Sequence, residues 1–406
     1  MSRSYRFVLP VFSIPRPASF AALSLALTVL SCLFASPQAQ AQTLTVLHSF
    51  GGPEGENPTF GLVRDSAGNL YGTTVYGGIL GKCDNELGGG VVYKVEPSGN
   101  TTALHDFNEG PDGCFPSSTL AIDSAGNLYG TTSNNVFKID SAGNFTTLFD
   151  IPVMASVQGT LFRDSQGNLY GTNGEGGNDG CQFGCGYVFK LDTSGKGTIL
   201  YAFTGGADGS APVAGVIRDA AGNLYGTTYN GGDLACPNGC GVVFKIDTTG
   251  KQTILYTFTG GADGQWPDTP LVLDSAGNLY GVTGSGGDLN CGRPNRGCGT
   301  VYKVTPAGKK SILYAFKAGS DGVYPTGGLA RDSAGNLYGT TAYGGDAQNG
   351  IVFKLDNSGH ETVLLRFNNN EGSQPWGGVI RDAEGNLYGT TLYGGLGQGI
   401  VFKLEP

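Results

Sequence analysis

The stretch DSAGNLYGTT at residues 65–74 returns with few changes at Asp123, Asp164, Asp219, Asp274, Asp332 and Asp382. Successive copies are 58, 41, 55, 55, 58 and 50 residues apart, a spacing too long for a β-helix rung and close to one propeller blade. The Asp side chain can accept backbone N–H groups while the Gly takes a left-handed conformation, as in short hairpin loops. We therefore predict that each copy is a structural hairpin and that the chain holds seven repeats of one unit.

Two further apolar runs recur once in each unit. One resembles VFKL at 401–404, and the other resembles TILYAF at 198–203. Together with the runs on both sides of each turn, they give four strands per unit. The 71 glycines lack the strict period of collagen and separate short apolar runs, as expected of strands joined by tight turns. The composition therefore predicts an all-β protein.

The order of the runs predicts a closed ring. After residue 42 the chain begins with a fourth-strand run at 44–50, and it ends with a third-strand run at 401–404. Together these two segments complete one unit, which closes a ring and removes its exposed strand edges. We predict a seven-bladed β-propeller of four-stranded antiparallel blades over residues 42–406, closed by the N-terminal strand joining the last blade.

The first 41 residues have the pattern of a signal peptide. Three arginines precede an apolar run at 20–34, and small residues follow at Ala39 and Ala41. An uncleaved anchor is an alternative, but the run is short for a bilayer crossing. A lipoprotein acylated at Cys32 is disfavoured by the bulky Leu30. We expect a secreted or periplasmic protein with no transmembrane segment after the leader.

Charge excludes one class of partner. Removing residues 1–41 takes away three arginines and no acidic residue, so the formal net charge moves from −9 to −12. Binding to nucleic acid requires a basic face, and the chain has no Lys/Arg cluster that could form one. We expect no nucleic-acid partner and a monomeric protein.

Cysteine usage agrees with export. Eight cysteines remain after the leader, and they fall into neighbouring pairs: Cys83 with Cys114, Cys181 with Cys185, Cys236 with Cys240, and Cys291 with Cys298. An even number in an exported chain favours disulfides, although sequence alone does not fix the connectivity. Zinc bound by the two C-x-x-x-C loops is the alternative, but no histidine lies near them.

The repeated motifs resemble those of the GloVer tandem-repeat family over residues 43–406. The resemblance rests on DSAGNLYGTT, the G-G loop, VFKLD and TVLY-x-F recurring together in order. It implies an exported bacterial protein with no established activity and with varied C-terminal sorting signals. This chain departs from that pattern because it stops at Pro406 directly after the last strand. We therefore expect free secretion or periplasmic residence rather than surface anchoring.

The long loops are expected to share one face of the ring. They join the second strand to the third and the fourth strand to the next blade, and we call their side the upper face. Its aromatic residues are candidates for a glycan- or peptide-binding platform: Trp266, Tyr324, Trp376, Tyr76, Tyr343 and Tyr393. The last three come from units that are neighbours once the ring closes, so we expect them in one sector. The alternative is that these rings only fill gaps between blades.

Acidic residues recur on the same face in the pattern acidic-Gly-x-x-Pro, at Glu54, Asp112, Asp208, Asp263, Asp321 and Glu371. Each can stabilise its own turn. Calcium held by Asp208, Asp263 and Asp321 is the alternative, although one carboxylate per blade gives no compact ligand cluster. Five arginines also precede the turn Asp, and we expect them to pair with neighbouring turn aspartates: Arg64, Arg163, Arg218, Arg331 and Arg381.

Catalysis has little support in the sequence. The three histidines, His48, His105 and His360, lie in expected outer strands or a turn, so no nucleophile–base group is evident. We expect no catalytic residue and no cofactor, and a non-catalytic binding or scaffold protein that recognises a glycan, peptide or protein through the upper face. The alternative is a carbohydrate-active hydrolase or lyase with paired upper-face carboxylates.

Overall fold

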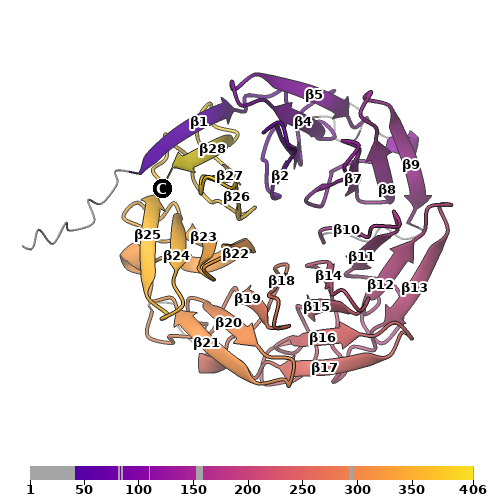
Figure 1. Ribbon diagram of the computed structural model, residues 1–406, viewed down its shortest axis with the longest axis vertical. Coiled ribbons are helices and arrows are strands. Elements are labelled where there is room, and N and C mark those ends of the chain that lie inside the picture. Colours follow the sequence, from indigo (N-terminus) through magenta and orange to yellow (C-terminus); the bar gives the residue numbers. More distant parts are fainter. Residues whose placement is uncertain are drawn as a thin grey trace, which may run out of the picture. The chain divides into compact units, whose positions relative to one another are not determined.

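The computed structural model describes residues 42–80, 83, 86–108, 110–151, 159–291 and 296–405. Its seven four-stranded antiparallel sheets form a ring, with the first strand of each blade beside the central channel (Figure 1). This is the predicted seven-bladed β-propeller. The predicted signal peptide and Cys32 lie outside the described residues. Within the described ranges, no helix has the length and apolarity needed to cross a membrane.

The first three blades contain strands β2 to β13. Blade 1 comprises β2 (Val63–Arg64), β3 (Leu70–Thr74), β4 (Val91–Val95) and β5 (Thr101–Asp106). Blade 2 comprises β6 (Ala121–Ile122), β7 (Leu128–Thr131), β8 (Asn135–Ile139) and β9 (Phe145–Asp150). Blade 3 comprises β10 (Phe162–Arg163), β11 (Leu169–Asn173), β12 (Tyr187–Leu191) and β13 (Gly197–Ala202).

The remaining blades follow the same order. Blade 4 comprises β14 (Val216–Arg218), β15 (Leu224–Thr228), β16 (Val242–Ile246) and β17 (Gln252–Thr257). Blade 5 comprises β18 (Val272–Leu273), β19 (Leu279–Thr283), β20 (Thr300–Val304) and β21 (Lys310–Ala315). Blade 6 comprises β22 (Val323–Arg331), β23 (Leu337–Tyr343), β24 (Ile351–Leu355) and β25 (Glu361–Arg366). Short 3-10 turns precede blades 2, 5 and 6, at Gly110–Asp112, Gly261–Asp263 and Gly319–Asp321.

Blade 7 is built from both ends of the described chain. It contains β26 (Val379–Arg381), β27 (Leu387–Thr391), β28 (Ile400–Glu405) and, as its outer strand, β1 (Thr43–Ser49). Strand β1 pairs antiparallel with β28 from Thr43 opposite Glu405 to Ser49 opposite Ile400. The predicted closure by the N-terminal strand is confirmed.

The last glycine of the repeated GNLYG motif has a packing role. Gly226 in β15 lies opposite Phe244 in β16, and a Cβ at Gly226 would lie 2.6 Å from the Phe244 ring. The same close approach recurs in every blade, in the pairs Gly72/Tyr93, Gly130/Phe137, Gly171/Phe189, Gly226/Phe244, Gly281/Tyr302, Gly339/Phe353 and Gly389/Phe402. Any side chain here would displace the aromatic ring at the centre of the blade.

Aromatic rings also connect the blades. Phe203, just after the outer strand of blade 3, packs edge-on against Phe244 of blade 4 with ring centroids 5.2 Å apart. Five other boundaries carry equivalent pairs: Phe50/Tyr93, Phe107/Phe137, Phe258/Tyr302, Phe316/Phe353 and Phe367/Phe402. At the seventh boundary, Ile151 packs in one cluster with Phe189. The core therefore lies largely between blades, where apolar burial and edge-to-face contacts stabilise the ring.

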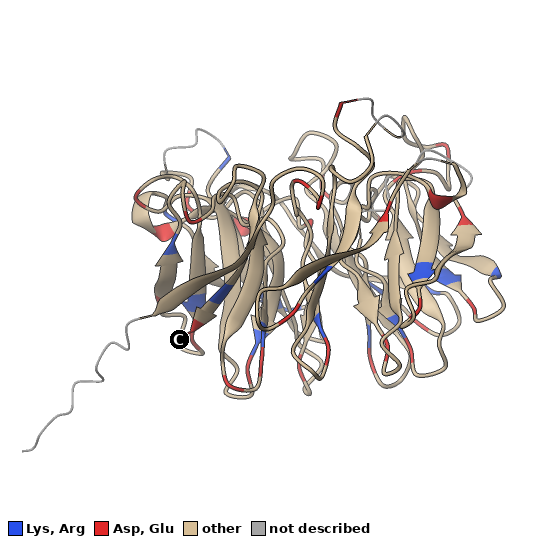
Figure 2. Ribbon diagram, turned by 90° about the horizontal axis from the view of Figure 1, so that it is seen from above, with Lys and Arg blue, Asp and Glu red and all other residues tan. Residues whose placement is uncertain are grey.

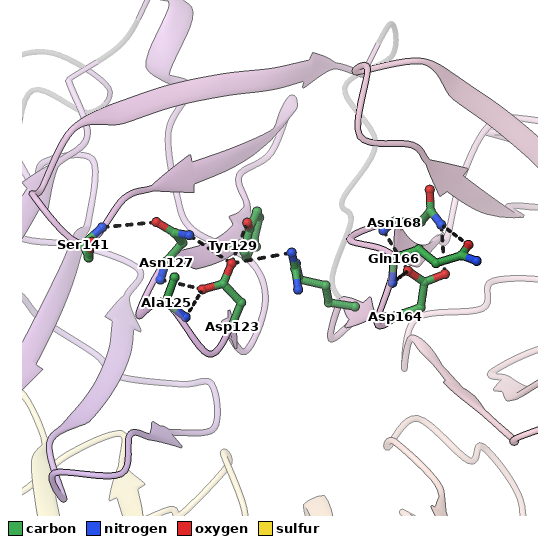
Figure 3. A network of polar contacts seen from close by, with 9 residues as sticks. Asp123, Ala125, Asn127, Tyr129, Ser141, Asp164, Gln166 and Asn168 are labelled. Carbon is green, nitrogen blue, oxygen red and sulfur yellow. Dashed lines mark hydrogen bonds and ion pairs between the residues drawn. The ribbon is translucent and has the colours of Figure 1, made fainter.

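The repeated aspartate organises the short turns on the lower face, opposite the upper face (Figure 2). Figure 3 shows the polar contacts of one such turn, around Asp123. Asp123 accepts hydrogen bonds from the backbone N–H and side-chain amide of Asn127, both at 2.9 Å, and from the Tyr129 hydroxyl at 3.0 Å. Burial opposes ionisation, but these hydrogen bonds outweigh it and lower the pKa of Asp123. All seven turns share this Asp–Asn–Tyr arrangement, so the prediction of structural hairpins is confirmed.

The arginines before these turns lie between blades. The Arg163 guanidinium lies 3.6 Å from Asp123 of the preceding blade and 5.3 Å from the centre of the Tyr129 ring. Arg64, Arg218, Arg331 and Arg381 lie over the equivalent tyrosines of their preceding blades at 5.4 to 5.6 Å. The expected ion pair thus forms at Arg163, and the other four contact the tyrosine that binds the aspartate. Their cation–π contacts stabilise the blade boundaries.

The four predicted cysteine pairs form disulfides, which rules out the zinc alternative for these residues: Cys83–Cys114, Cys181–Cys185, Cys236–Cys240 and Cys291–Cys298. All four lie in upper-face loops. Cys83–Cys114 links the β3–β4 loop of blade 1 to the segment that enters blade 2. Four disulfides fit an oxidising extracellular or periplasmic compartment.

Candidate ligand-binding site

The x-Pro segments on the upper face connect neighbouring blades. Trp266 has a positive φ of 59°, and its backbone N–H donates a hydrogen bond to the Cys240 carbonyl of blade 4. The following Pro267 packs on Gly241, where a Cβ would lie 2.7 Å from the proline ring. This x-Pro clip recurs six times, with the residue before proline at positive φ: Asn57, Phe115, Ala211, Trp266, Tyr324 and Gln374. The clip fixes the upper ends of the blades.

The acidic residues of these segments bind to their own outer strands. Asp263 accepts hydrogen bonds from the Tyr256 hydroxyl at 2.7 Å and from the Thr259 backbone at 2.9 Å. Asp208 and Asp321 accept equivalent bonds from the outer-strand tyrosine and the following backbone. The structure therefore does not bring the three predicted calcium ligands together. In the described part of the chain, no group of three or more Asp, Glu, His or Cys side chains could hold a metal ion.

The acidic residues Asp263 and Asp321 have different neighbours on the next outer strand, one basic and the other acidic. The Lys310 ammonium in β21 lies 2.8 Å from Asp263, whereas the equivalent position in β25 is Glu361, which faces Asp321. Burial, reinforced by the Asp321 charge, raises the pKa of Glu361 to about 7. Its Oε1 is buried and has no hydrogen-bond partner among the described residues. The boundary between blades 5 and 6 thus carries an unfavourable pair of acids.

Replacing Glu361 by lysine is expected to stabilise the propeller. Glu361→Lys would place an ammonium beside Asp321, as Lys310 does beside Asp263, and should raise the unfolding free energy at pH 8 by about 1–2 kcal/mol after solvent screening. Because the folded pKa lies above the usual 4.5, the cost of Glu361 appears as pH rises from about 4.5 to 7. Urea unfolding at pH 4 and pH 8 measures this difference.

Glu361→Gln is the matched control, because it removes the charge without adding a cation. At pH 8 we expect the unfolding free energy to be highest with lysine at position 361, intermediate with glutamine and lowest with glutamate. At pH 4 the glutamine and glutamate proteins should have nearly equal unfolding free energies. A Glu361→Lys protein less stable than the Glu361→Gln protein at pH 8 would contradict this account.

The upper end of the central channel forms a cavity of about 440 Å³. All seven blades contribute to it, six of them with residues that lie just before the first strand and blade 6 with residues 326–328 inside β22. The first strands surround the central channel (Figure 1). Its wall includes five threonines and several glycines, together with Phe60, Tyr229, Asp268 and Trp376. The cavity therefore combines exposed aromatic surface, hydroxyl groups and one carboxyl group in a concave site, the usual composition of a small-molecule pocket.

One of the six predicted aromatic residues lines this cavity, and two others pack against that residue. Trp376 lines the wall, with Tyr324 edge-on at 5.7 Å and Tyr343 edge-on at 6.5 Å between ring centroids. Trp266 reaches the cavity indirectly, because it stacks on the lining Tyr229 at 5.8 Å with 17° between the rings. Two of these residues, Trp266 and Tyr324, occupy x-Pro clips and so have restrained backbones.

The other two predicted aromatics lie elsewhere on the upper face. Tyr76 packs edge-on against Phe115 at 5.8 Å. Tyr393 is 45% exposed and does not belong to the cavity wall. The expected sector of three tyrosines therefore contributes only Tyr343 to the cluster around Trp376.

Sequence reasoning missed Asp268. It follows the proline of the blade 5 clip, at the position taken by Thr59, Val213, Thr326 and Trp376 in other blades. Its Oδ2 lies 3.5 Å from the Tyr324 hydroxyl, and its covered Oδ1 has no hydrogen-bond partner among the described residues. Burial raises the pKa of Asp268 to about 7. The signal was available in the repeat, as a carboxylate where other copies have neutral side chains.

Comparison with known protein families identifies the repeat. The model of the Gloeobacter/Verrucomicrobia repeat matches residues 33–233, 178–294 and 293–406, which covers the whole propeller. The chain belongs to this family. The expected resemblance is confirmed, and the three matched regions together span all seven blades described above. No curated protein has a significantly similar sequence.

Solved structures similar to this repeat protein share its fold at low identity. Virginiamycin B lyase from Staphylococcus aureus is 13% identical with a TM-score of 0.60, covering 90% of this chain and 99% of its own. Oligogalacturonate lyase from Vibrio parahaemolyticus is 10% identical with a TM-score of 0.53, covering 91% and 94%. The extracellular domain of a putative one-component system from B. thetaiotaomicron is 12% identical with a TM-score of 0.57, covering 89% and 40%. These likenesses establish the propeller fold.

Proposed function

We propose that this repeat protein is a non-catalytic binding protein, secreted or periplasmic, that holds a glycan in the cavity at the upper end of its channel. The observation that carries the proposal is Trp376, a half-buried indole on the wall of a 440 Å³ cavity that also presents threonine hydroxyls. Propeller folds serve both enzymes and binding domains, so the proposal rests on this site and not on the fold.

The chemistry of the wall suits a sugar better than a purely apolar ligand. The C–H face of a sugar ring can pack on Trp376 and Tyr229, while its hydroxyls can meet Thr59, Thr160 and nearby backbone groups. Trp376 is held in place because its Nε1–H donates a hydrogen bond to Gln374 at 3.3 Å, within the same x-Pro clip. A rigid aromatic group binds a ligand with little loss of conformational entropy.

Substitution of Trp376 tests the proposal. In a glycan array and a polysaccharide retention assay, we expect the protein to retain at least one glycan, and Trp376→Ala to weaken that binding at least about tenfold, or 1.4 kcal/mol. Tyr393→Ala is the control, since Tyr393 is exposed on the same face outside the cavity. Equal losses in both variants, or none in Trp376→Ala, would contradict a binding site at the cavity.

A carbohydrate-active hydrolase or lyase is the second candidate. Asp268 favours it, because a carboxyl group with a pKa of about 7 is suited to proton transfer near neutral pH. A two-carboxylate hydrolase needs a second carboxylate within about 5–10 Å, and Asp268 is the one carboxylate among the described residues of the cavity wall. Release of reducing ends from a retained glycan, abolished in Asp268→Asn, would favour the enzyme.

A further inference from the structure

In the described part of the chain, no lysine, arginine or histidine forms an ion pair with Asp268. The described residues that line the cavity include no lysine, arginine or histidine. Among the described residues, the side chains that hydrogen-bond to Asp268 or sense its charge are Tyr324, Tyr302 and Tyr229, and a tyrosine cannot supply a positive charge. Arg296 lies over the Trp266 ring, with its guanidinium 5.9 Å from the ring centre. A carboxylate withdrawn from water in this way is unfavourable unless a ligand supplies a positive charge.

We infer that the cavity selects a sugar unit that carries a protonated amine, with Asp268 as its counter-ion. The inference rests on the proposed glycan-binding function and specifies its ligand. An ammonium group at Asp268 would also lie near Tyr324, whose hydroxyl is 3.5 Å from Oδ2 and whose ring lies 5.7 Å from that of Trp376. The face of either ring can attract a cation that reaches it. An anionic sugar would instead be repelled by the Asp268 carboxylate, and this repulsion makes the cavity selective for cationic sugars.

The carboxyl group can adjust to such a ligand. The terminal torsion of an aspartate side chain is broad, so Oδ1, which has no donor among the described residues, can turn toward an ammonium while Oδ2 stays near the Tyr324 hydroxyl. The net charge of the whole chain, −9, adds a long-range attraction for cationic glycans. Salt screens this diffuse attraction more than a contact within the cavity.

Three β-1,4-linked hexasaccharides test whether the amine itself is recognised, because they share a backbone and differ only at carbon 2. They are the hexamers of glucosamine, N-acetylglucosamine and glucose. Varying the salt concentration separates a contact with Asp268 from the long-range attraction of the net charge. Calorimetry with the purified protein at pH 7 in about 0.15 and 0.5 M salt should show the glucosamine hexamer binding at least tenfold tighter than the glucose hexamer at both salt concentrations. Asp268→Asn should abolish this preference, so that the glucosamine and glucose hexamers bind this variant within about twofold of each other. Asp233→Asn, which changes a partly buried upper-face carboxylate outside the cavity wall, should keep the preference.

The outcomes distinguish the two proposals. If the three hexamers bind equally, or if Asp268→Asn keeps the preference, the ammonium inference is overturned while glycan binding stands. If no hexamer binds and no other glycan is retained, the proposed function fails and the inference with it. Circular dichroism and thermal unfolding check the fold of the variant, and Asp268→Asn is expected to unfold at or above the wild-type temperature at pH 8, because it removes a charge that no cation among the described residues compensates.

Discussion

Removing strand β1, by starting the chain at residue 50, is expected to unfold most of the protein at room temperature. Strand β1 is the outer strand of blade 7, and its loss would expose the whole edge of β28 to water. Leu47, packed in the cluster that joins blades 7 and 1, would be lost with it. We expect a cost of about 5 kcal/mol or more, comparable with the total stability of a typical domain.

The matched control is a chain that starts at residue 42, which keeps β1 intact and should unfold at the same temperature as the longer protein. A synthetic peptide of residues 42–51 added to the shortened chain should restore part of the lost stability, because its pairing partner β28 is still present. Thermal unfolding followed by circular dichroism measures all three samples. A shortened chain with an unchanged midpoint would show that the ring does not depend on its closing strand.

Gly241→Ala is expected to destabilise the propeller strongly, although it adds only one methyl group. Gly241 has φ +89°, and a Cβ there would lie 2.3 Å from the Thr228 carbonyl oxygen and 2.7 Å from Pro267 of the next blade. The methyl group would add overpacking at the x-Pro clip to the cost of a left-handed backbone. We expect a loss of about 3–5 kcal/mol, measured by urea unfolding.

Gly143→Ala isolates the contribution of the clip. Gly143 has the same φ of +89°, but no atom lies within 4 Å of its ideal Cβ position. This variant should cost only about 1–2 kcal/mol, the backbone penalty alone. The difference between the two variants therefore reports how firmly neighbouring blades are joined at the upper face. Equal losses of unfolding free energy in the two variants would mean that Gly241 and Pro267 can move apart to accommodate the methyl group without destabilising the protein.

Much of the architecture could be read from the repeat because its signals are local. The hairpin at 65–74 needs only an aspartate, an asparagine and a glycine within five residues. Close cysteine pairs such as Cys236 and Cys240 leave little choice of partner. The strand at 43–49 could be assigned to the last blade because the chain begins with a fourth-strand run and ends with a third-strand run. The two ends complete one blade only if the ring closes.

The candidate site could not be read in the same way. Trp376 was predicted to lie on the upper face, but its contact with Tyr324 and its place on the cavity wall depend on the packing of blades 6 and 7. The outward direction of Asp263, which contacts Tyr256 and Lys310, depends on side-chain hydrogen bonds across the outer strands. Spacing along the chain carries no information on either.

The sequence by itself determined the number of blades, the strands in each and the closure of the ring, because each follows from the period and order of the repeat. It favoured disulfides between neighbouring cysteines, and the structure fixed their connectivity. Only the tertiary structure decided which residues share the cavity. Tyr229, Asp268 and Trp376 come from three different blades, and closing the ring brings them to one wall. That Asp268 Oδ1 has no hydrogen-bond partner among the described residues is likewise a property of that cavity, because a fully exposed carboxylate oxygen would be satisfied by water.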